Sequence, residues 1–412
     1  MQHILILGAG TAGTMAANML RKELGSSYRI TVVDQDEIHY YQPGFLFLPF
    51  GTYTADDVVR QKREFIHKGI EYISASIEEL TPHDNQVTLG DGSVLNYDHL
   101  IIATGTHPDP SETPGLESDE YGRTIHDFYT FDGAIALRAA LEKFNAGRIV
   151  VNLIEMPIKC PVAPLEFAFL AEAHFTDRGV RDDVEIVYVT PMSDVFTKPV
   201  AAHELGDMFE ERGIEFEPDF YLERIDAEHR KLVSFDEREV PYDLLVTVPI
   251  NKGAAFIEGT GLGDELNHVK VDPGNFQSKD FPNIFAIGDA ASLPTSKAGS
   301  VAHFAMETFV PNFVDHLMGL PMTRAFDGHA NCYIETGHEK AMLIDFNYTT
   351  QPLPGKYPVP GIGPFSLLQE SGINHRGKLA FRWMYWNLLL PGRHMPVPSH
   401  MSMAGKDTEL DV

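Results

Sequence analysis

Short runs of aliphatic residues recur along the chain, and several are followed by stretches with the apolar spacing of an amphipathic helix. Short runs rich in β-branched side chains are typical of strands that are buried on both faces. The pattern predicts an α/β fold with strands at HILIL (3–7), RITVVD (29–34), YDHLIIAT (97–104), RIVVNLIE (148–155), VEIVYV (184–189), YDLLVTV (242–248) and FPNIFAI (281–287).

A glycine-rich turn follows the first strand. Gly8 permits the tight turn, Gly10 lets a pyrophosphate approach the backbone, and Gly13 lets the following helix pack closely on the strand. That helix points its N-terminus at the phosphates. Asp34 ends the second strand at the spacing expected for a ribose contact. The turn therefore predicts a dinucleotide site, for FAD or NAD.

Two later strand ends indicate which dinucleotide it is. One carries Ala103, Thr104 and Gly105, and the other carries Gly288 and Asp289. Both resemble the paired signatures of two-dinucleotide-domain flavoproteins, the glutathione-reductase-like class. The resemblance implies FAD, with Asp289 at its ribityl and phosphate region. The expected cofactor contacts are Gly8, Gly10, Thr11, Ala12, Gly13, Asp34, Gln42, Ile77, Ala103, Thr104, Gly105, Gly288, Asp289 and Lys297.

Lys297 lies beside the helix that follows the Gly-Asp pair. The resemblance places that helix's N-terminus at the flavin pyrimidine, where positive charge stabilises an anionic reduced ring. A plain surface charge is the alternative interpretation of this lysine.

The strands over 148–155, 184–189 and 242–248 predict a second Rossmann-like domain, of the NAD-binding type. Its first strand runs into MPIKCPVAP instead of a glycine turn, and its second ends at Thr190 and Pro191 instead of an acid. Prolines also remove amide donors from the loop. We therefore expect a thiol, Cys160, where a nicotinamide would otherwise reach the flavin.

The composition narrows the class of protein. The chain has 412 residues and is 43% hydrophobic, which suits a folded protein of two or three domains. A net charge of -27 argues against nucleic acid as a partner, and two cysteines are too few for a thiolate metal site. A strand directly after Met1 leaves no room for a cleaved signal peptide, and no apolar run is long enough to span a bilayer.

Cys160 precedes a helical pattern over 163–175 and follows Lys159. A helix N-terminus and an adjacent cation predict a lowered pKa for this thiol. Cys332 lies in a strand-like run between Gly328 and Gly337. Two inert buried thiols are the alternative interpretation of the pair.

The resemblance is sharpest to sulfide:quinone oxidoreductases and flavocytochrome c sulfide dehydrogenases. It rests on YYQPGFLF (40–47), Cys160 with Pro161 and Glu166, PTSKAG (294–299), Cys332 and YWNLLLPG (385–392). In that family two cysteines form a redox-active bridge beside FAD, sulfide attacks the bridge, and two electrons pass to FAD. The resemblance implies that Cys160 is the flavin-side thiolate and that Cys332 carries the sulfur chain. Glu166 is then a base, or an acid that interacts with the helix dipole.

The chain departs from the family in two places. Many quinone-linked members carry a third cysteine in the segment that corresponds to 122–134, where His126 and Asp127 stand here. His126 is a proton carrier or an ordinary structural histidine. Flavocytochrome enzymes attach FAD through a cysteine near YYQPG, but Gln42 and its neighbours offer no thiol. We therefore expect FAD to be non-covalent.

No Asp or Glu occurs from Ser371 to Lys406, and both tryptophans lie in this segment. GKLAFRWMYWNLLLPGRHMP predicts a short amphipathic helix in a membrane interface, with Trp383, Leu388 and Leu389 in the lipid. A core helix or a dimer contact is the alternative. The resemblance implies a quinone opposite the bridge, and the candidate residues are Lys297, Phe365, Phe381, Trp383, Tyr385 and Trp386.

The sequence as a whole predicts a peripheral membrane sulfide:quinone oxidoreductase that uses FAD, with sulfide and membrane quinone as substrates. A type II NADH:quinone dehydrogenase, a sulfide dehydrogenase with a cytochrome acceptor, and a redox sensor are the alternatives. The membrane face and the oligomeric state stay open, a homo-oligomer included. The expected parts are the FAD domain (1–110 and 271–325), a connection (111–145), the second Rossmann-like domain (146–270) and a C-terminal region (326–412).

Overall fold

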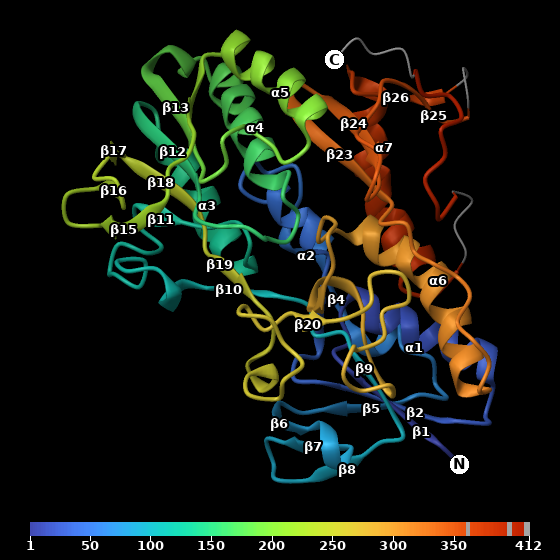
Figure 1. The fold of residues 1–412 in the computed structure, drawn as a ribbon. Coiled ribbons are helices and arrows are strands. Elements are labelled where there is room, and N and C mark those ends of the chain that lie inside the picture. Colours follow the sequence, from blue (N-terminus) through green and yellow to red (C-terminus); the bar gives the residue numbers. More distant parts are fainter. Residues whose placement is uncertain (360–362, 394–397, 408–412) are drawn as a thin grey trace.

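The computed structural model describes residues 1–359, 363–393 and 398–407 (Figure 1). A five-stranded parallel sheet in the order β21-β9-β1-β2-β5 forms the base of the first domain. Its strands are β1 (His3–Leu7), β2 (Arg29–Asp34), β5 (Glu71–Ser74), β9 (His99–Ile102) and β21 (Ile284–Ala286). The sheet thus unites segments from the two ends of the predicted FAD domain.

Both faces of this sheet are covered, which explains its nearly continuous apolar strands. Helices α1 (Thr11–Leu24) and α6 (Gly299–Leu317) pack side by side on one face (Figure 1). The antiparallel strands β6 (Ile77–Thr81), β7 (Gln86–Leu89) and β8 (Val94–Asn96) cover the other. Ile4 and Ile6 accordingly join the core under the helices, while Leu5 and Leu7 join the core under β6 and β7.

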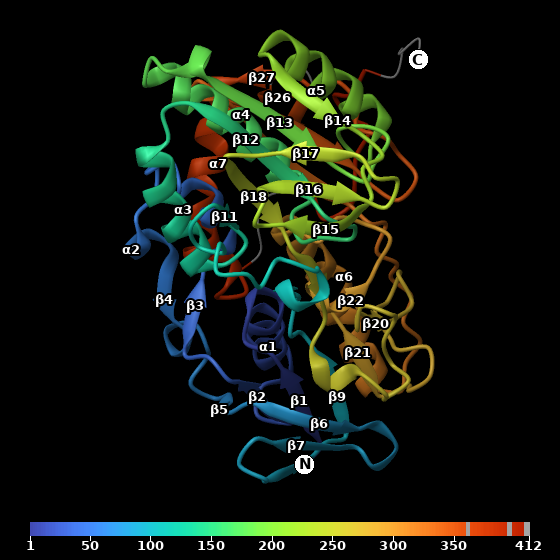
Figure 2. The same cartoon turned by 90° about the vertical axis from the view of Figure 1, so that its left-hand side faces the viewer.

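The second domain repeats this plan (Figure 2). Its parallel sheet has the order β11-β18-β12-β13-β14. The strands are β11 (Ile125–His126), β12 (Gly147–Leu153), β13 (Val184–Val189), β14 (Ile214–Glu217) and β18 (Leu244–Val248). The helices are α3 (Phe131–Lys143), α4 (Ala163–Asp177) and α5 (Pro199–Glu211), and a small sheet is made of β15 (Leu222–Asp226), β16 (Lys231–Ser234) and β17 (Glu239–Pro241). The predicted α/β fold with two Rossmann-like domains is confirmed.

The C-terminal region adds a sheet in the order β23-β24-β26-β25. It contains β23 (Ala330–Gly337), β24 (Lys340–Phe346), β25 (Gly355–Val359), β26 (Gly363–Leu367) and β27 (Glu370–Ser371), followed by α7 (Gly372–Met384) and a π-helical turn (Tyr385–Leu389). Strand β23 packs on α4 of the second domain, as the red and green ribbons show (Figure 1). This contact brings the segment that carries Cys332 to the helix that follows Cys160.

Short elements join these parts. Strands β10 (His107–Asp109) and β19 (Ile250–Lys252) pair antiparallel where the chain crosses between the two domains. The remaining elements are β3 (Ile38–Tyr40), β4 (Val59–Gln61), β20 (Val269–Lys270), β22 (Ala291–Ser292) and α2 (Ala55–Val58), together with 3-10 turns such as η1 (Gln42–Phe47), η2 (Lys62–Glu64) and η7 (Gly288–Ala290).

The predicted C-terminal helix exists, but it begins at Gly372 and ends in the π-helical turn at Leu389. Residues 394–396 of that predicted helix lie outside the described residues. Within the described parts of the chain, no helix has both the length and the apolarity needed to cross a bilayer.

Candidate active site

A cavity of about 950 Å³ lies where the two Rossmann-like domains and the C-terminal region meet. Most of the predicted site residues line it, although they come from widely separated segments of the chain. They are Gly8, Gly10, Thr11, Ala12, Asp34, Gln42, Ile77, Ala103, Thr104, Gly105, Cys160, Glu166, Gly288, Asp289, Lys297, Cys332, Phe365, Phe381 and Tyr385. The structure thus collects the dinucleotide turn, the two thiols and the C-terminal aromatic residues around one space.

The turn after β1 has the geometry of a phosphate site. Gly8 has a φ of 96°, and a Cβ on Gly13 would lie 2.0 Å from the Gly8 carbonyl oxygen. A Cβ on Gly10 would meet nothing within 4 Å, so this side of the turn is open. Helix α1 begins at Thr11 without a side-chain cap, which leaves its first amides available to an anion. The turn therefore fits the pyrophosphate of FAD.

Asp34 is held in place at the end of β2. Its Oδ2 accepts a hydrogen bond from the Ala9 amide at 2.6 Å, and its Oδ1 lies 2.6 Å from the Nζ of Lys62. Lys62 is buried and also lines the cavity. The sequence reasoning missed this lysine, because it lies in the short turn η2 and no motif points to it.

Other polar groups in the cavity lack partners. The Oγ1 atoms of Thr104 and Thr106 are buried and have no hydrogen bond within the described chain. Buried hydroxyl groups without a partner are uncommon in folded proteins, so a bound group is the natural partner for them. Together with the glycine turn and Asp34, these hydroxyls fit a dinucleotide.

Lys297 is nearly buried within the turn that carries Asp289. Its Nζ donates to the carbonyl oxygens of Asp289, at 2.7 Å, and of Ala291, at 3.0 Å. Burial lowers the pKa of Lys297 and raises the pKa of Asp289, while the attraction between the two charges opposes both shifts. Lys297 is therefore a cation fixed by its own loop, and not a solvated surface charge.

Cys160 lies in the loop between β12 and α4, in an unusual conformation. Its φ is 50°, a left-handed backbone value that residues other than glycine rarely adopt. Its amide donates to the Lys297 carbonyl oxygen at 2.6 Å, and its own carbonyl accepts from the hydroxyl of Tyr129 at 3.1 Å. Backbone strain of this kind is often found at functional sites. The loop thus fixes the Cys160 thiol beside the turn that carries Asp289.

The predicted lowering of the Cys160 pKa is wrong. Helix α4 begins at Ala163, so the thiol lies before the first helical turn. Burial raises the pKa of Cys160 well above its ordinary value, and the nearby charge of Glu166 raises it further. Lys378 opposes this shift without reversing it. Desolvation therefore outweighs the cation and the helix end on which the prediction rested.

Cys332 faces the same cavity from β23. Burial raises the pKa of its thiol to about 12, and Glu166 contributes to this shift as well. The charge of Cys332 in turn raises the pKa of Cys160, which places the two thiols in each other's electrostatic range. Both cysteines are free, so the structure does not contain the bond between them that the family resemblance implies.

Glu166, on α4, lines the same cavity as the two thiols, and only 1% of it is exposed. Its Oε1 accepts hydrogen bonds from the amide of Glu335, at 2.6 Å, and from the Nζ of Lys378. Burial raises the pKa of Glu166 to about 7, although Lys378 lowers it. A carboxyl group with this pKa can exchange a proton at neutral pH.

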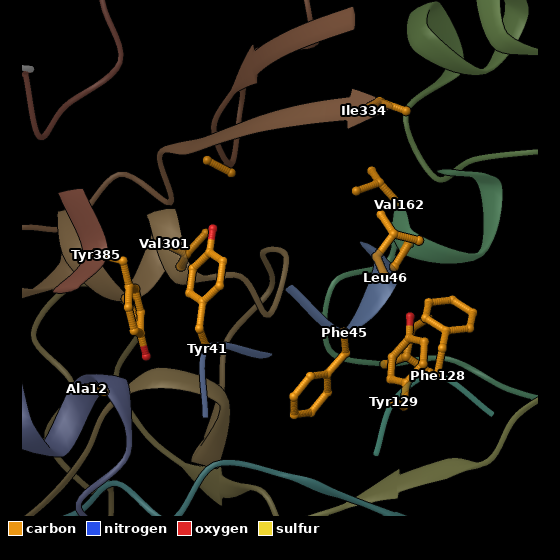
Figure 3. Close-up of a cluster of buried hydrophobic side chains, with 14 of the residues drawn as sticks. Ala12, Tyr41, Phe45, Leu46, Phe128, Tyr129, Val162, Val301, Ile334 and Tyr385 are labelled. Carbon is orange, nitrogen blue, oxygen red and sulfur yellow. The ribbon is translucent and has the colours of Figure 1, made fainter. Parts of the chain in front are cut away.

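Tyr385 connects the C-terminal helix to the dinucleotide turn. Its hydroxyl lies 2.6 Å from the Oγ1 of Thr11 and 2.6 Å from the Nε2 of His39. Its ring packs beside that of Tyr41, with the centroids 4.9 Å apart (Figure 3). Phe365 and Phe381 also line the cavity. The C-terminal region therefore contributes several aromatic side chains to the wall of the site.

The two tryptophans lie in different surroundings. Trp386 is 9% exposed and stacks on Phe65 with a centroid distance of 5.2 Å, so it belongs to the core and cannot contact lipid. Leu389 is also buried, which corrects its expected place in a membrane interface. Trp383 is 62% exposed, and neither tryptophan is among the described residues that line the cavity.

His126 is placed as a structural histidine. It is buried in β11, its Nε2 bonds to the Arg123 carbonyl oxygen at 3.0 Å, and it does not line the cavity. Asp127 accepts hydrogen bonds from the amides of Tyr129 and Thr130, both at 2.7 Å. These residues hold the start of α3 and do not replace the third cysteine that many members of the resembled family carry.

Comparison with known proteins shows the family to which the chain belongs. A family model described as pyridine nucleotide-disulphide oxidoreductase matches residues 2–308. The chain therefore belongs to that family of flavoprotein oxidoreductases, which implies FAD as its cofactor.

Within this family the chain is similar to sulfide:quinone oxidoreductases. It is 26% identical over 397 residues to the mitochondrial enzyme of Dictyostelium discoideum and 27% identical over 402 residues to that of Mus musculus. Each alignment covers 95% of this chain and 86% of the relative. The solved structure of the sulfide:quinone oxidoreductase from Aquifex aeolicus shares the fold, with a TM-score of 0.80, 22% identity and coverage of 95% of this chain and 92% of that one. The resemblance inferred from the motifs is confirmed.

Proposed function

We propose that this chain is an FAD-dependent sulfide:quinone oxidoreductase that oxidises sulfide to polysulfide or sulfur. The observation that carries the proposal is the shared cavity: Cys160, Cys332 and the buried carboxyl of Glu166 open onto the same space as the dinucleotide turn. A thiol pair beside an internal base suits the chemistry of sulfur better than that of a pyridine nucleotide.

The reaction begins with the two sulfurs joined, directly or through inserted sulfur. Hydrosulfide attacks the sulfur at Cys332, a new S–S bond forms there, the bond toward Cys160 breaks, and the Cys160 sulfur leaves as a thiolate with the electron pair. Glu166, as the carboxylate, takes the proton of the bound hydrosulfide. When bound, FAD supplies the two-electron acceptor that allows the Cys160 sulfur to bond again to the terminal sulfur on Cys332.

We assign the flavin side to Cys160. Its amide bonds to the Lys297 carbonyl oxygen, and the Lys297 ammonium group bonds to the carbonyl of Asp289, in the turn that carries the cofactor motif. Cys332 is tied instead to the C-terminal sheet through β23. The Cys160 backbone is therefore held by the segment that carries the cofactor motif, whereas Cys332 is held by the C-terminal sheet.

The quinone is proposed to bind against the aromatic side chains that the C-terminal region brings to the cavity wall, which are Phe365, Phe381 and Tyr385. The exposed face of α7 carries Ile373, Arg376, Ala380 and Trp383, an apolar and basic surface that suits a membrane interface. The protein is thus proposed to be a peripheral membrane protein, with Trp383 as its aromatic anchor.

Anaerobic titration of the FAD-loaded protein with sulfide tests the proposal. We expect about one equivalent of sulfide per FAD to bleach the flavin absorbance, because each sulfide delivers two electrons. A short-chain quinone should then restore the absorbance. Rapid bleaching by NADH but not by sulfide would favour a type II NADH dehydrogenase instead. Reoxidation by cytochrome c and not by quinone would favour the soluble sulfide dehydrogenase.

A further inference from the structure

A buried chain of titratable groups leads from Glu166 away from the cavity. Glu335, on β23, donates its amide to Glu166 and is itself fully buried. Its Oε2 lies 2.8 Å from the Nδ1 of His375, on α7. Its Oε1 is buried and has no hydrogen-bond partner among the described residues. A carboxylate that only fastened α7 to β23 would be expected to use both oxygens.

His375 is the outer end of this chain. It is not among the residues that line the cavity, yet 17% of its side chain is exposed, so its accessible surface lies outside the cavity. An imidazole has one nitrogen that can accept a proton and one that can donate it, so it can pass a proton between a carboxyl group and water. The groups from Glu166 to His375 therefore connect the interior of the site with the surface.

We propose that Glu166, Glu335 and His375 form a proton relay from the thiol site to solvent, with Lys378 holding the two carboxyl groups together. The proposal rests on the proposed function. Each hydrosulfide oxidised to the level of sulfur gives up two electrons and one proton; FAD and then quinone take the electrons, the quinone takes up two protons at its own site, and the proton released at the thiols passes out through the relay. Glu166 receives it, one water molecule passes it to the free Oε1 of Glu335, and His375 releases it.

One cation and four weakly acidic groups surround the relay. Lys378 is attracted to both Glu166 and Glu335, which outweighs the effect of burial and raises the pKa of Lys378, so it stays charged and does not carry the proton. The other titratable groups that face the relay are the thiols Cys160 and Cys332 and the phenols Tyr53 and Tyr129. Burial raises the pKa of each of these four groups, so a thiol or phenol that carries its proton holds it near neutral pH and does not pass it on.

His375→Asn and His375→Ala test the relay in the FAD-loaded full chain. Asparagine can keep the bond to Glu335 but cannot carry a proton. We expect both variants to lower kcat for sulfide-dependent quinone reduction at pH 7 about tenfold, with the KM for sulfide unchanged. Added imidazole should restore the His375→Ala rate in a saturable way. His338→Asn is the matched control, because His338 forms a similar pair with Glu172, at 3.0 Å, outside the relay.

Unchanged turnover in both His375 variants, or a loss that imidazole does not rescue, overturns the relay. Equal flavin content and melting temperature in all variants exclude misfolding as the cause. If the wild-type protein is not reduced by sulfide at all, the proposed function fails and not the relay.

A second measurement does not depend on turnover. Infrared titration of the full chain should show a buried carboxyl that ionises near pH 7, the value expected for Glu166. Glu166→Gln should remove this signal. Glu335→Gln should shift it to lower pH, because the charge of Glu335 raises the pKa of Glu166, and His338→Asn should leave it in place. A signal that Glu335→Gln does not move would show that the two carboxyl groups are not coupled, which contradicts the relay.

Discussion

The two Rossmann-like domains share one architecture and differ at the first junction between strand and helix. In the first domain, β1 leads through Gly8 to a helix with uncapped amides at Thr11. In the second, β12 leads through a proline-containing loop to α4, and Cys160 occupies that loop in a left-handed conformation. The same position in the fold thus presents amides for phosphate in one domain and a thiol in the other. The fold alone does not determine what the junction binds.

Removing the thiol chemistry of the second domain should have the largest effect. We expect Cys332→Ser to lower sulfide-to-quinone turnover by at least about 10³-fold, because the bridge can no longer form. FAD content should be unchanged, since the proposed cofactor contacts around the glycine turn and Asp34 are left intact. Turnover that survives this substitution, measured anaerobically with a short-chain quinone, would remove Cys332 from the mechanism and favour a role for the cysteines as a switch.

A substitution that fills the turn of the first domain should weaken FAD binding, which the cysteine substitution leaves unchanged. Gly13→Ala places a Cβ 2.0 Å from the Gly8 carbonyl oxygen, so the turn must open. We expect the affinity for FAD to fall about 100-fold, measured by fluorescence quenching on titration with FAD. Gly206→Ala in α5 is the control, because a Cβ there meets nothing within 4 Å. Equal FAD binding by the two variants would contradict the assigned turn.

Neutralising the internal base should have an intermediate effect that depends on pH. The pKa of Glu166 is raised to about 7, so the carboxylate that accepts the proton is scarce below this pH and abundant above it. Turnover of the wild-type protein should therefore rise with pH through about 7. Glu166→Gln should lower the plateau about 100-fold and remove this step from the pH–rate profile. A step that persists in the variant would belong to another group.

Releasing Asp34 from its partner should weaken the cofactor site moderately. In Lys62→Met, Asp34 loses the ammonium group that lies 2.6 Å from its Oδ1, and its orientation toward a ribose is less fixed. We expect the Kd for FAD to rise about tenfold, measured by the same titration. Lys68→Met, on the exposed part of the same segment, should leave the Kd as it is.

The smallest expected effect concerns the membrane. Trp383→Ala should lower binding to anionic vesicles about threefold, measured by sedimentation, because a single interfacial aromatic anchor is lost. Phe235→Ala removes a comparably exposed aromatic residue from the turn between β16 and β17 and should have no effect. Equal losses in the two variants would argue against a specific membrane face on α7.

Much of the fold was predictable because the signals are local. The glycine turn, the buried strands and the strand-to-helix junction at Cys160 each lie within a few consecutive residues. The partners of the site were not predictable in this way. Lys62, Lys378 and Glu335 reach it through packing between distant segments, and their spacing in the sequence contains no sign of this.

Burial explains the two incorrect expectations. The sequence shows that Cys160 lies near a cation and a helix end, but it does not show how completely the thiol is removed from water, and desolvation decides its pKa. Trp386 and Leu389 have the composition of an interfacial helix and nevertheless pack inward, since the same apolar pattern serves a core.

The hydrogen bond between Thr11 and Tyr385 joins residues that are 374 positions apart. The wall of the dinucleotide pocket is therefore completed only after Tyr385 has been synthesised and folded against the first domain. A nascent chain that has made the first domain has the glycine turn but lacks one side of the pocket. Stable retention of the cofactor is accordingly a late event in the maturation of this protein, and truncations near the C-terminus should release FAD although they leave the phosphate turn intact.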